Sequence, residues 1–166
     1  VSDSFVNLRG MSESGGRRIK RALLIRVSSI HFVSEQDLNK FSKIERISPY
    51  ISGRKKEIEE ENKSIKADKS LLLNGRNMTN IGLFRRYALA YLQNHPEIND
   101  ELTVMVRQLA PTPHGVPMEI YVFVKDKVWV NYERIMSDIF DHLLASIPFF
   151  DLECFEYISS PSYSSK

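Results

Sequence analysis

The chain has 166 residues, 42% of them hydrophobic, which is enough for the core of one domain and too few for two comfortable ones. The formal net charge is only +2, so charge gives no argument for a nucleic acid or a strongly acidic partner. The single cysteine, Cys154, excludes an internal disulfide and fits a reducing compartment, and no run approaches the ~18 apolar residues of a membrane span. The chain starts at Val1 inside a polar stretch without an apolar signal segment, which suggests a soluble piece of a longer protein.

The first predicted elements are a strand and a helix. Residues 20–33 are rich in β-branched and aliphatic side chains and predict a strand over about 21–33, with a bulge near Ser28 and Ser29. Ser34 then precedes acidic residues, and its side-chain oxygen can cap the free N–H groups of a helix. Apolar residues recur at helical spacing until Pro49, which we expect to interrupt the helix.

A charged stretch follows, over about residues 50–70. Its only large apolar residues from 51 onward are Ile51, Ile58 and Ile65, and a stripe this narrow covers little surface. Two interpretations remain open: an exposed charged helix or arm, and an arm that binds a partner.

The second half contains a helix, a hairpin, a helix and a last strand. Thr79 is placed to cap a helix that ends near Pro96, because the residue before a proline is steered out of helical geometry. Two strands at 102–109 and 118–124, joined by a proline-rich loop, predict a β-hairpin. A wide apolar stripe predicts a buried helix over 132–147. The alternation of residues 152–158 predicts a last strand, and residues 159–166 are expected to form a polar tail.

The element order β-α-β-β-α-β is typical of a ferredoxin-like split βαβ domain. We therefore predict an α+β fold, an α/β sandwich whose four-stranded antiparallel sheet carries two main helices on one face, with the charged helical stretch inserted in the first crossover. The predicted core includes Val106, Ile120, Ile139 and Leu143.

No pattern of catalytic or metal-ligating residues emerges, so we expect no enzyme activity, metal or cofactor. The four histidines lie in different predicted elements and form no HExxH or Cys/His pairing: His31, His95, His114 and His142. Asp138 and His142 are four residues apart, and a surface helix pair is favoured over an acid–base dyad. The glycines match neither phosphate-binding loop pattern.

The sharpest basic feature is the run Arg17, Arg18, Lys20 and Arg21, at the start of the first strand. Three roles are open: a solvated strand edge or subunit contact, a surface that attracts anionic lipids or ions, and nucleic-acid binding. RNA-binding domains of this topology carry aromatic residues in a defined pattern on their central strands, and that pattern is absent here. A solvated strand edge or subunit contact is favoured, followed by a surface that attracts anionic lipids or ions, and nucleic-acid binding comes last.

Three stretches resemble the miniconductance branch of the small-conductance mechanosensitive channel (MscS) family. They are SFVNLRGMSESGGRRIKR at 4–21, NGRNMTNIGLFRRYALAYLQNHPEI at 74–98, and LTVMVRQLAPTPHGVP with the residues that follow it at 102–148. Together they cover most of the chain in collinear order. The resemblance implies that 1–16 are the trailing strand and junction of a missing middle β domain, and that 17–158 are the C-terminal α/β domain. It also implies that residues 50–70 are the insertion that distinguishes this branch.

The same resemblance implies a function and a location. The domain would form the wall and subunit contacts of a vestibule on the cytoplasmic side of the bacterial inner membrane. Seven copies would surround the ions that pass when membrane tension opens the channel, and membrane contact would come only through the missing N-terminal part. The alternative is a free-standing ferredoxin-like regulatory module that binds a small ligand. An upstream reading frame that encodes membrane spans would favour the channel.

Overall fold

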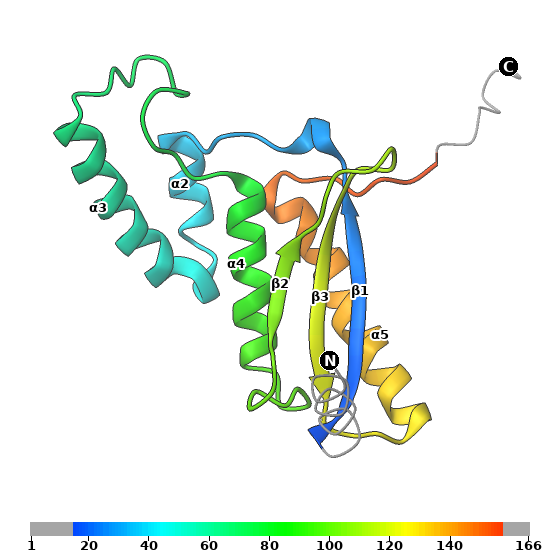
Figure 1. The fold of residues 1–166 in the computed structure, drawn as a ribbon. Helices are drawn as coiled ribbons and strands as arrows, with labels where there is room; N and C mark the ends of the chain where they lie inside the picture. Colours follow the sequence, from blue (N-terminus) through cyan, green and yellow to red (C-terminus); the bar gives the residue numbers. More distant parts are fainter. Residues whose placement is uncertain (1–14, 158–166) are drawn as a thin grey trace, which may run out of the picture.

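The centre of the fold is a three-stranded antiparallel sheet with strand order β1-β3-β2 (Figure 1). The strands are β1, Arg17–Ile25; β2, Met105–Gln108; and β3, Val116–Val124. The computed structural model describes residues 15–157. The predicted trailing strand and junction over 1–16 and the polar tail over 159–166 therefore lie outside the described residues, except for Gly15 and Gly16.

Strand β1 starts earlier and ends earlier than predicted. It begins at Arg17 and pairs with β3 over its whole length, from Arg17 opposite Val124 to Ile25 opposite Val116. It then gives way to a 3₁₀ turn over Val27–Ser29, in which the Ser29 backbone and hydroxyl both donate to the Arg26 carbonyl. The predicted strand over 21–33 is thus wrong beyond residue 25, because local turn bonds to Arg26 outweigh the β-propensity of the residues that follow.

The predicted hairpin is confirmed, although its first strand is shorter than expected. β2 pairs with β3 from Met105 opposite Tyr121 to Gln108 opposite Met118. The loop closes through paired backbone hydrogen bonds between Thr112 and Gly115, and Gly115 has φ +110, which favours glycine.

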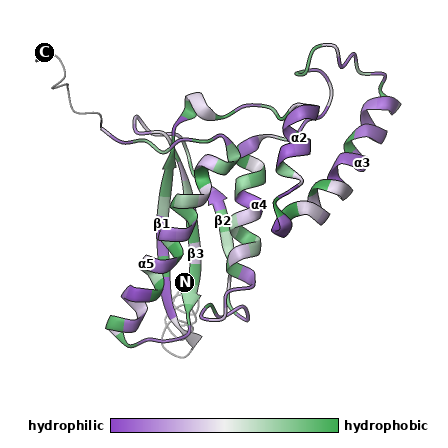
Figure 2. Cartoon of the chain, turned by 180° about the vertical axis from the view of Figure 1, so that it is seen from behind, coloured by the Kyte–Doolittle hydropathy of each residue, from purple (hydrophilic) through white to green (hydrophobic). Residues whose placement is uncertain are grey.

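The two predicted main helices, which are α4 and α5, lie on one face of the sheet, as predicted (Figures 1 and 2). Thr79 caps α4, Asn80–Gln93, by accepting a 3.1 Å hydrogen bond from the Gly82 backbone N–H. Helix α5 spans Trp129–Ser146 and continues into a 3₁₀ turn over Ile147–Phe150. All four predicted core residues are buried: Val106, Ile120, Ile139 and Leu143.

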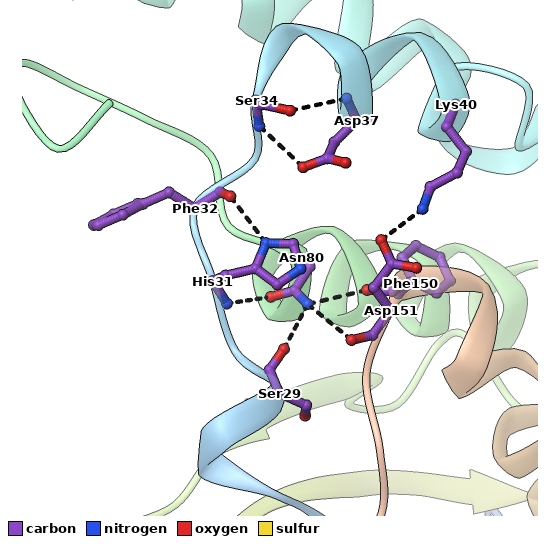
Figure 3. Close-up of polar contacts among 9 residues, drawn as sticks. All are labelled: Ser29, His31, Phe32, Ser34, Asp37, Lys40, Asn80, Phe150 and Asp151. Carbon is purple, nitrogen blue, oxygen red and sulfur yellow. Dashed lines mark hydrogen bonds and ion pairs between the residues drawn. The ribbon is translucent and has the colours of Figure 1, made fainter. Parts of the chain in front are cut away.

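The charged stretch is helical, but Pro49 starts its helix instead of interrupting the previous one. The short helix α2, Glu35–Phe41, has the predicted Ser34 cap, in which Ser34 and Asp37 exchange side-chain and backbone hydrogen bonds (Figure 3). A 3₁₀ turn over Glu45–Ile47 leads into α3, Ser48–Ser64, with the proline in its first turn. Proline is tolerated there because the first N–H groups of a helix have no intrahelical partner.

We call residues 48–78, which comprise α3 and the loop that follows it, the arm. Figure 1 shows α3 beside α2, on the side of the domain away from α5. Ile51 and Ile58 are buried against the domain, whereas Ile65 is 60% exposed. Only part of the predicted narrow apolar stripe is therefore buried. The loop of the arm carries further exposed apolar side chains at Leu71, Leu72 and Leu73.

The last predicted strand, over 152–158, does not form. Its segment makes one antiparallel bridge, between Cys154 and Ile25, with backbone hydrogen bonds from Arg26 to Glu153 and from Phe155 to Leu24. The aromatic residues beyond the bridge contact the hairpin loop, where Tyr157 hydrogen-bonds His114 at 2.9 Å and the Phe155 ring lies 5.0 Å from the same imidazole. These contacts replace further pairing along β1, so the described sheet has three strands and not the predicted four.

Among the described residues, none of the helices combines the length and apolar character needed to cross a bilayer.

Candidate functional site

The four basic residues of β1 lie on both faces of the sheet, because successive strand residues point to opposite sides. Arg17 and Arg21 lie on the helix side, where their guanidinium groups are 4.5 Å and 5.0 Å from the ring centroids of Tyr132 and Phe140 on α5. Arg18 and Lys20 lie on the open face. The run is therefore two pairs of cations, not one basic patch.

The α5 contacts fix the helix-side pair without neutralising it. Arginine over an aromatic ring contributes about 0.5–1 kcal/mol at exposed sites. The Tyr132 hydroxyl also donates a hydrogen bond to the Arg18 carbonyl, and burial raises the pKa of Tyr132, which keeps this donor protonated. None of the four cations forms an ion pair with a residue in the described range 15–157. Within these residues, no acid cancels their charge.

The open face also carries a buried acid that the sequence analysis did not single out. Glu119 lies in the middle of β3 with a side chain only 6% exposed, and its Oε1 is 2.8 Å from Nε of Arg107 across the hairpin. A buried carboxylate needs such a partner, since an unpaired one costs several kcal/mol. The sequence does carry a signal for this buried acid, because Glu119 is a charged residue in the middle of the apolar run from 116 to 124. The pair holds β2 to β3 and engages the Glu119 carboxylate.

His95 and His142 both pack on the ring of Tyr91, whereas His31 and His114 lie elsewhere, and the predicted Asp138–His142 pair does not form. His142 Nε2 is 2.7 Å from the Tyr87 hydroxyl, and its ring stacks on Tyr91 at 4.0 Å between centroids. Asp138 instead lies 4.0 Å from Arg134. Within residues 15–157, no three His, Cys, Asp or Glu side chains are placed to hold a metal ion. Burial also raises the pKa of the Cys154 thiol, which disfavours the reactive thiolate.

The His142 environment predicts a loss of stability in mild acid. Burial, the Arg46 charge and His95 lower the pKa of His142, and burial also lowers the pKa of His95. The unfolded chain therefore takes up these protons first, so the free energy of unfolding will fall as pH drops below about 6.5, the ordinary histidine pKa, and level off below the folded pKa values. Urea melts at pH 7.5, 6.5 and 5.5 measure this.

Replacing His142 with glutamine provides the control for that prediction. The variant should lose less stability than the original chain between pH 7.5 and 5.5, and the remaining loss should come from His95. Equal pH dependence in both chains would contradict the role assigned to His142.

The most connected polar side chain of the described structure is Asn80, which sequence reasoning missed. It is fully buried at the first turn of α4 and joins three segments (Figure 3). Its Nδ2 donates to the carbonyls of Ser29 and Phe150 at 2.9 and 3.0 Å, and its Oδ1 accepts from the His31 backbone at 2.9 Å. An asparagine directly after a predicted helix cap gave no signal of this role, because all three partners are distant in sequence.

Lys40 reinforces the same junction, with its ammonium 2.5 Å from the Asp151 carboxylate (Figure 3). Asp151 adopts a left-handed backbone conformation, with φ +59, at the end of the 3₁₀ turn. The cluster in Figure 3 therefore fastens the segment before α2, the last turn of α2 and the start of α4 to the end of the turn after α5. The role of the cluster is structural, because it holds α2 and α4 in place against the turn that follows α5.

A comparison of the sequence with models of known protein families found no match.

Proposed function

We propose that this chain is the C-terminal domain of a mechanosensitive channel of the MscS family, and that it forms the vestibule wall and subunit contacts on the cytoplasmic side of the bacterial inner membrane. The observation that carries the proposal is the collinear resemblance of residues 4–21, 74–98 and 102–148 to the miniconductance branch. The domain would have no catalytic role. It would act through charged side chains on its surface, which face ions or other copies of the chain.

The resemblance also favours a fourth strand in the intact assembly. The bridge between Ile25 and Cys154 lies on the edge of β1 opposite β3, since Ile25 also pairs with Val116. A strand extended from this bridge would give the antiparallel order 4-1-3-2, which is that of the split βαβ domain. We propose that residues 152–156 are the remnant of that strand.

The cations of β1, which form no ion pair within residues 15–157, support the proposal physically. A ring of copies would repeat Arg17, Arg18, Lys20 and Arg21 around one axis, which multiplies a charge that is modest in a single chain. Arg18 and Lys20 are exposed on the open face, so they would face either the ion path or the neighbouring copy.

The test compares the two pairs of cations in the full-length protein. If Arg18 and Lys20 face the ion path, the double change of Arg18→Glu with Lys20→Glu will alter conductance or rectification in ~0.1 M salt. The effect will largely vanish in ~1 M salt, because the screening length falls from about 10 Å to about 3 Å. If they hold copies together, native mass analysis will show less assembled protein while the surviving channels conduct normally.

The matched control is the change of Arg17→Glu with Arg21→Glu on the helix side of the same strand. This control changes the net charge by the same amount but also removes the contacts with Tyr132 and Phe140. Its main effect should therefore be a lower stability of the domain. Normal currents and normal assembly with Arg18→Glu and Lys20→Glu would eliminate both roles. An upstream stop codon in the gene would instead favour the free-standing ligand-binding module.

A further inference from the structure

A cavity of about 340 Å³ lies between the arm and the rest of the domain. Its walls come from the segment before α2, from α2, from α3 and from the loop that returns to α4. The volume is within the range of small-molecule sites, roughly 300–1,000 Å³.

The walls of the cavity are mainly apolar. Val33, Leu38 and Ile58 are buried side chains on three different segments, and Met78 and Leu72 complete the lining from the loop. These are flexible or branched aliphatic groups with no aromatic ring among them. Such a lining fits an aliphatic chain better than a planar or polar molecule.

The rim of the cavity carries two cations, Lys63 and Lys69, that form no ion pair with an acid of the described residues. Lys63 is exposed and forms no ion pair with any residue between 15 and 157. The Lys69 ammonium donates hydrogen bonds to the carbonyl of Leu72, the carbonyl of Asn74 and the side-chain oxygen of Asn77. All three acceptors are neutral, so they satisfy its donors and leave its positive charge in place.

The remaining charged groups of the lining nearly balance. Lys55 lies 3.7 Å from Glu35, and Arg76 binds the carboxylates of Glu57 and Glu61, which lie outside the lining. Glu59 is the one lining acid in the described chain without an ion pair. The charges of the lining and of the two acids paired with Arg76 offset each other overall, so Lys63 and Lys69 are local positive groups without an acidic partner in the described chain.

The cavity wall is fixed before any ligand arrives. Buried Asn62 on α3 accepts from the Arg76 N–H at 2.7 Å and donates to the Arg76 carbonyl at 3.0 Å, which holds the loop against the helix. Gly75 has φ +73, and any side chain there would collide with Asn62. A preformed wall lowers the ordering cost of binding.

We propose that this cavity binds an amphipathic anion, an aliphatic chain with a carboxylate or a similar anionic head. The chain occupies the slot between Leu38, Ile58 and Met78, and the head lies at Lys63 within the field of Lys69. The site is independent of the channel proposal, since it lies wholly within one copy of the domain.

The test is titration of the ¹⁵N-labelled chain with decanoate, monitored by NMR. The expected result is saturable binding with a Kd on the order of 0.1–1 mM and shifts confined to the arm and α2. Acetate, which has the head alone, and decyltrimethylammonium, which has the same chain length with the opposite charge, should bind at least about fivefold more weakly. Equal binding of all three, or shifts outside the cavity, would overturn the proposal.

Two variants and a matched control locate the site. Lys63→Glu should weaken decanoate binding at least about fivefold through the head group. Leu72→Ser should weaken it through the wall, with little risk to folding because Leu72 is already 37% exposed. Lys56→Glu makes the same charge change on the same helix outside the lining and should leave binding unchanged. Equal affinities in all of these chains would contradict the proposed site.

A vesicle experiment separates the two sources of such a ligand. Flotation with vesicles of neutral lipid, and with vesicles containing anionic lipid, reports whether the head can belong to a membrane. If the chain floats only with anionic vesicles and the Lys63→Glu variant does not float, the ligand is a membrane lipid. If the chain binds decanoate but does not float with either kind of vesicle, the ligand is a free fatty acid. Vesicle binding that is unchanged by Lys63→Glu would oppose use of this cavity.

Discussion

Replacing Asn80 with alanine will lower the free energy of unfolding by about 3 kcal/mol or more. The change removes the side-chain partners of the Ser29 carbonyl, the Phe150 carbonyl and the His31 N–H at once. A buried polar group left without a partner costs about 1–3 kcal/mol, and of these three bonds the one to Phe150 is buried and the other two are partly buried. Urea unfolding followed by circular dichroism measures the loss.

The matched control for this prediction is Asn94→Ala. Asn94 is exposed at the C-terminal cap of the same helix, where its Nδ2 donates to the Ala90 carbonyl at 2.8 Å. Its loss should cost within about 0.5 kcal/mol, as expected of exposed positions. A cost below about 1 kcal/mol for Asn80→Ala would show that the junction in Figure 3 does not depend on this side chain.

Truncation of the α5 core is expected to have an effect of similar size. Leu143 and Ile139 are fully buried between α5 and the sheet, and replacing either with alanine should cost about 2–5 kcal/mol. The cost combines the lost transfer of apolar groups from water with the cavity that remains. Denaturant melts of the two variants give the measurement.

Leu144 offers an internal control for the core prediction because it is the next residue on the same helix and is 48% exposed. Leu144→Ala makes the same chemical change and should cost less than about 1 kcal/mol. Similar losses for Leu143→Ala and Leu144→Ala would contradict the orientation of α5 on the sheet.

The parts of the fold predicted correctly are those fixed by local chemistry. Thr79 and Ser34 cap helices because each side-chain oxygen accepts from the N–H group three residues later, a relation visible in sequence. The apolar stripe of α5 and the apolar run of β3 likewise depend only on neighbouring residues. Burial of Ile120 and Ile139 follows from those patterns.

The errors arise where distant contacts decide the local structure. Residues 26–33 have β-propensity, yet turn bonds to Arg26 and a backbone bond from Val33 to Met78 determine their path. Phe155 and Tyr157 leave the sheet edge because His114, in a loop some forty residues earlier, offers an aromatic contact and a hydrogen bond. No pattern within either segment encodes these partners.

The candidate site shows the same division. The basic run of β1 was visible in sequence, and strand alternation alone divides Arg17 and Arg21 from Arg18 and Lys20 once the strand is placed. The aromatic partners Tyr132 and Phe140 come from a helix more than a hundred residues later. Asn80 and the cavity under the arm have no local signal at all, since each is assembled from separate segments.

The pairing of β1 with β3 has a consequence for how the protein folds during its synthesis. β1 is the first described strand to emerge from the ribosome, but its partner β3 lies about a hundred residues later in the chain. At ordinary rates of translation, the edge of β1 stays open for roughly 5–20 seconds before Val124 is available to pair with Arg17. Arg17, Arg18, Lys20 and Arg21 occupy that open edge meanwhile, and charges on an unpaired edge oppose its pairing with nascent strands of neighbouring chains.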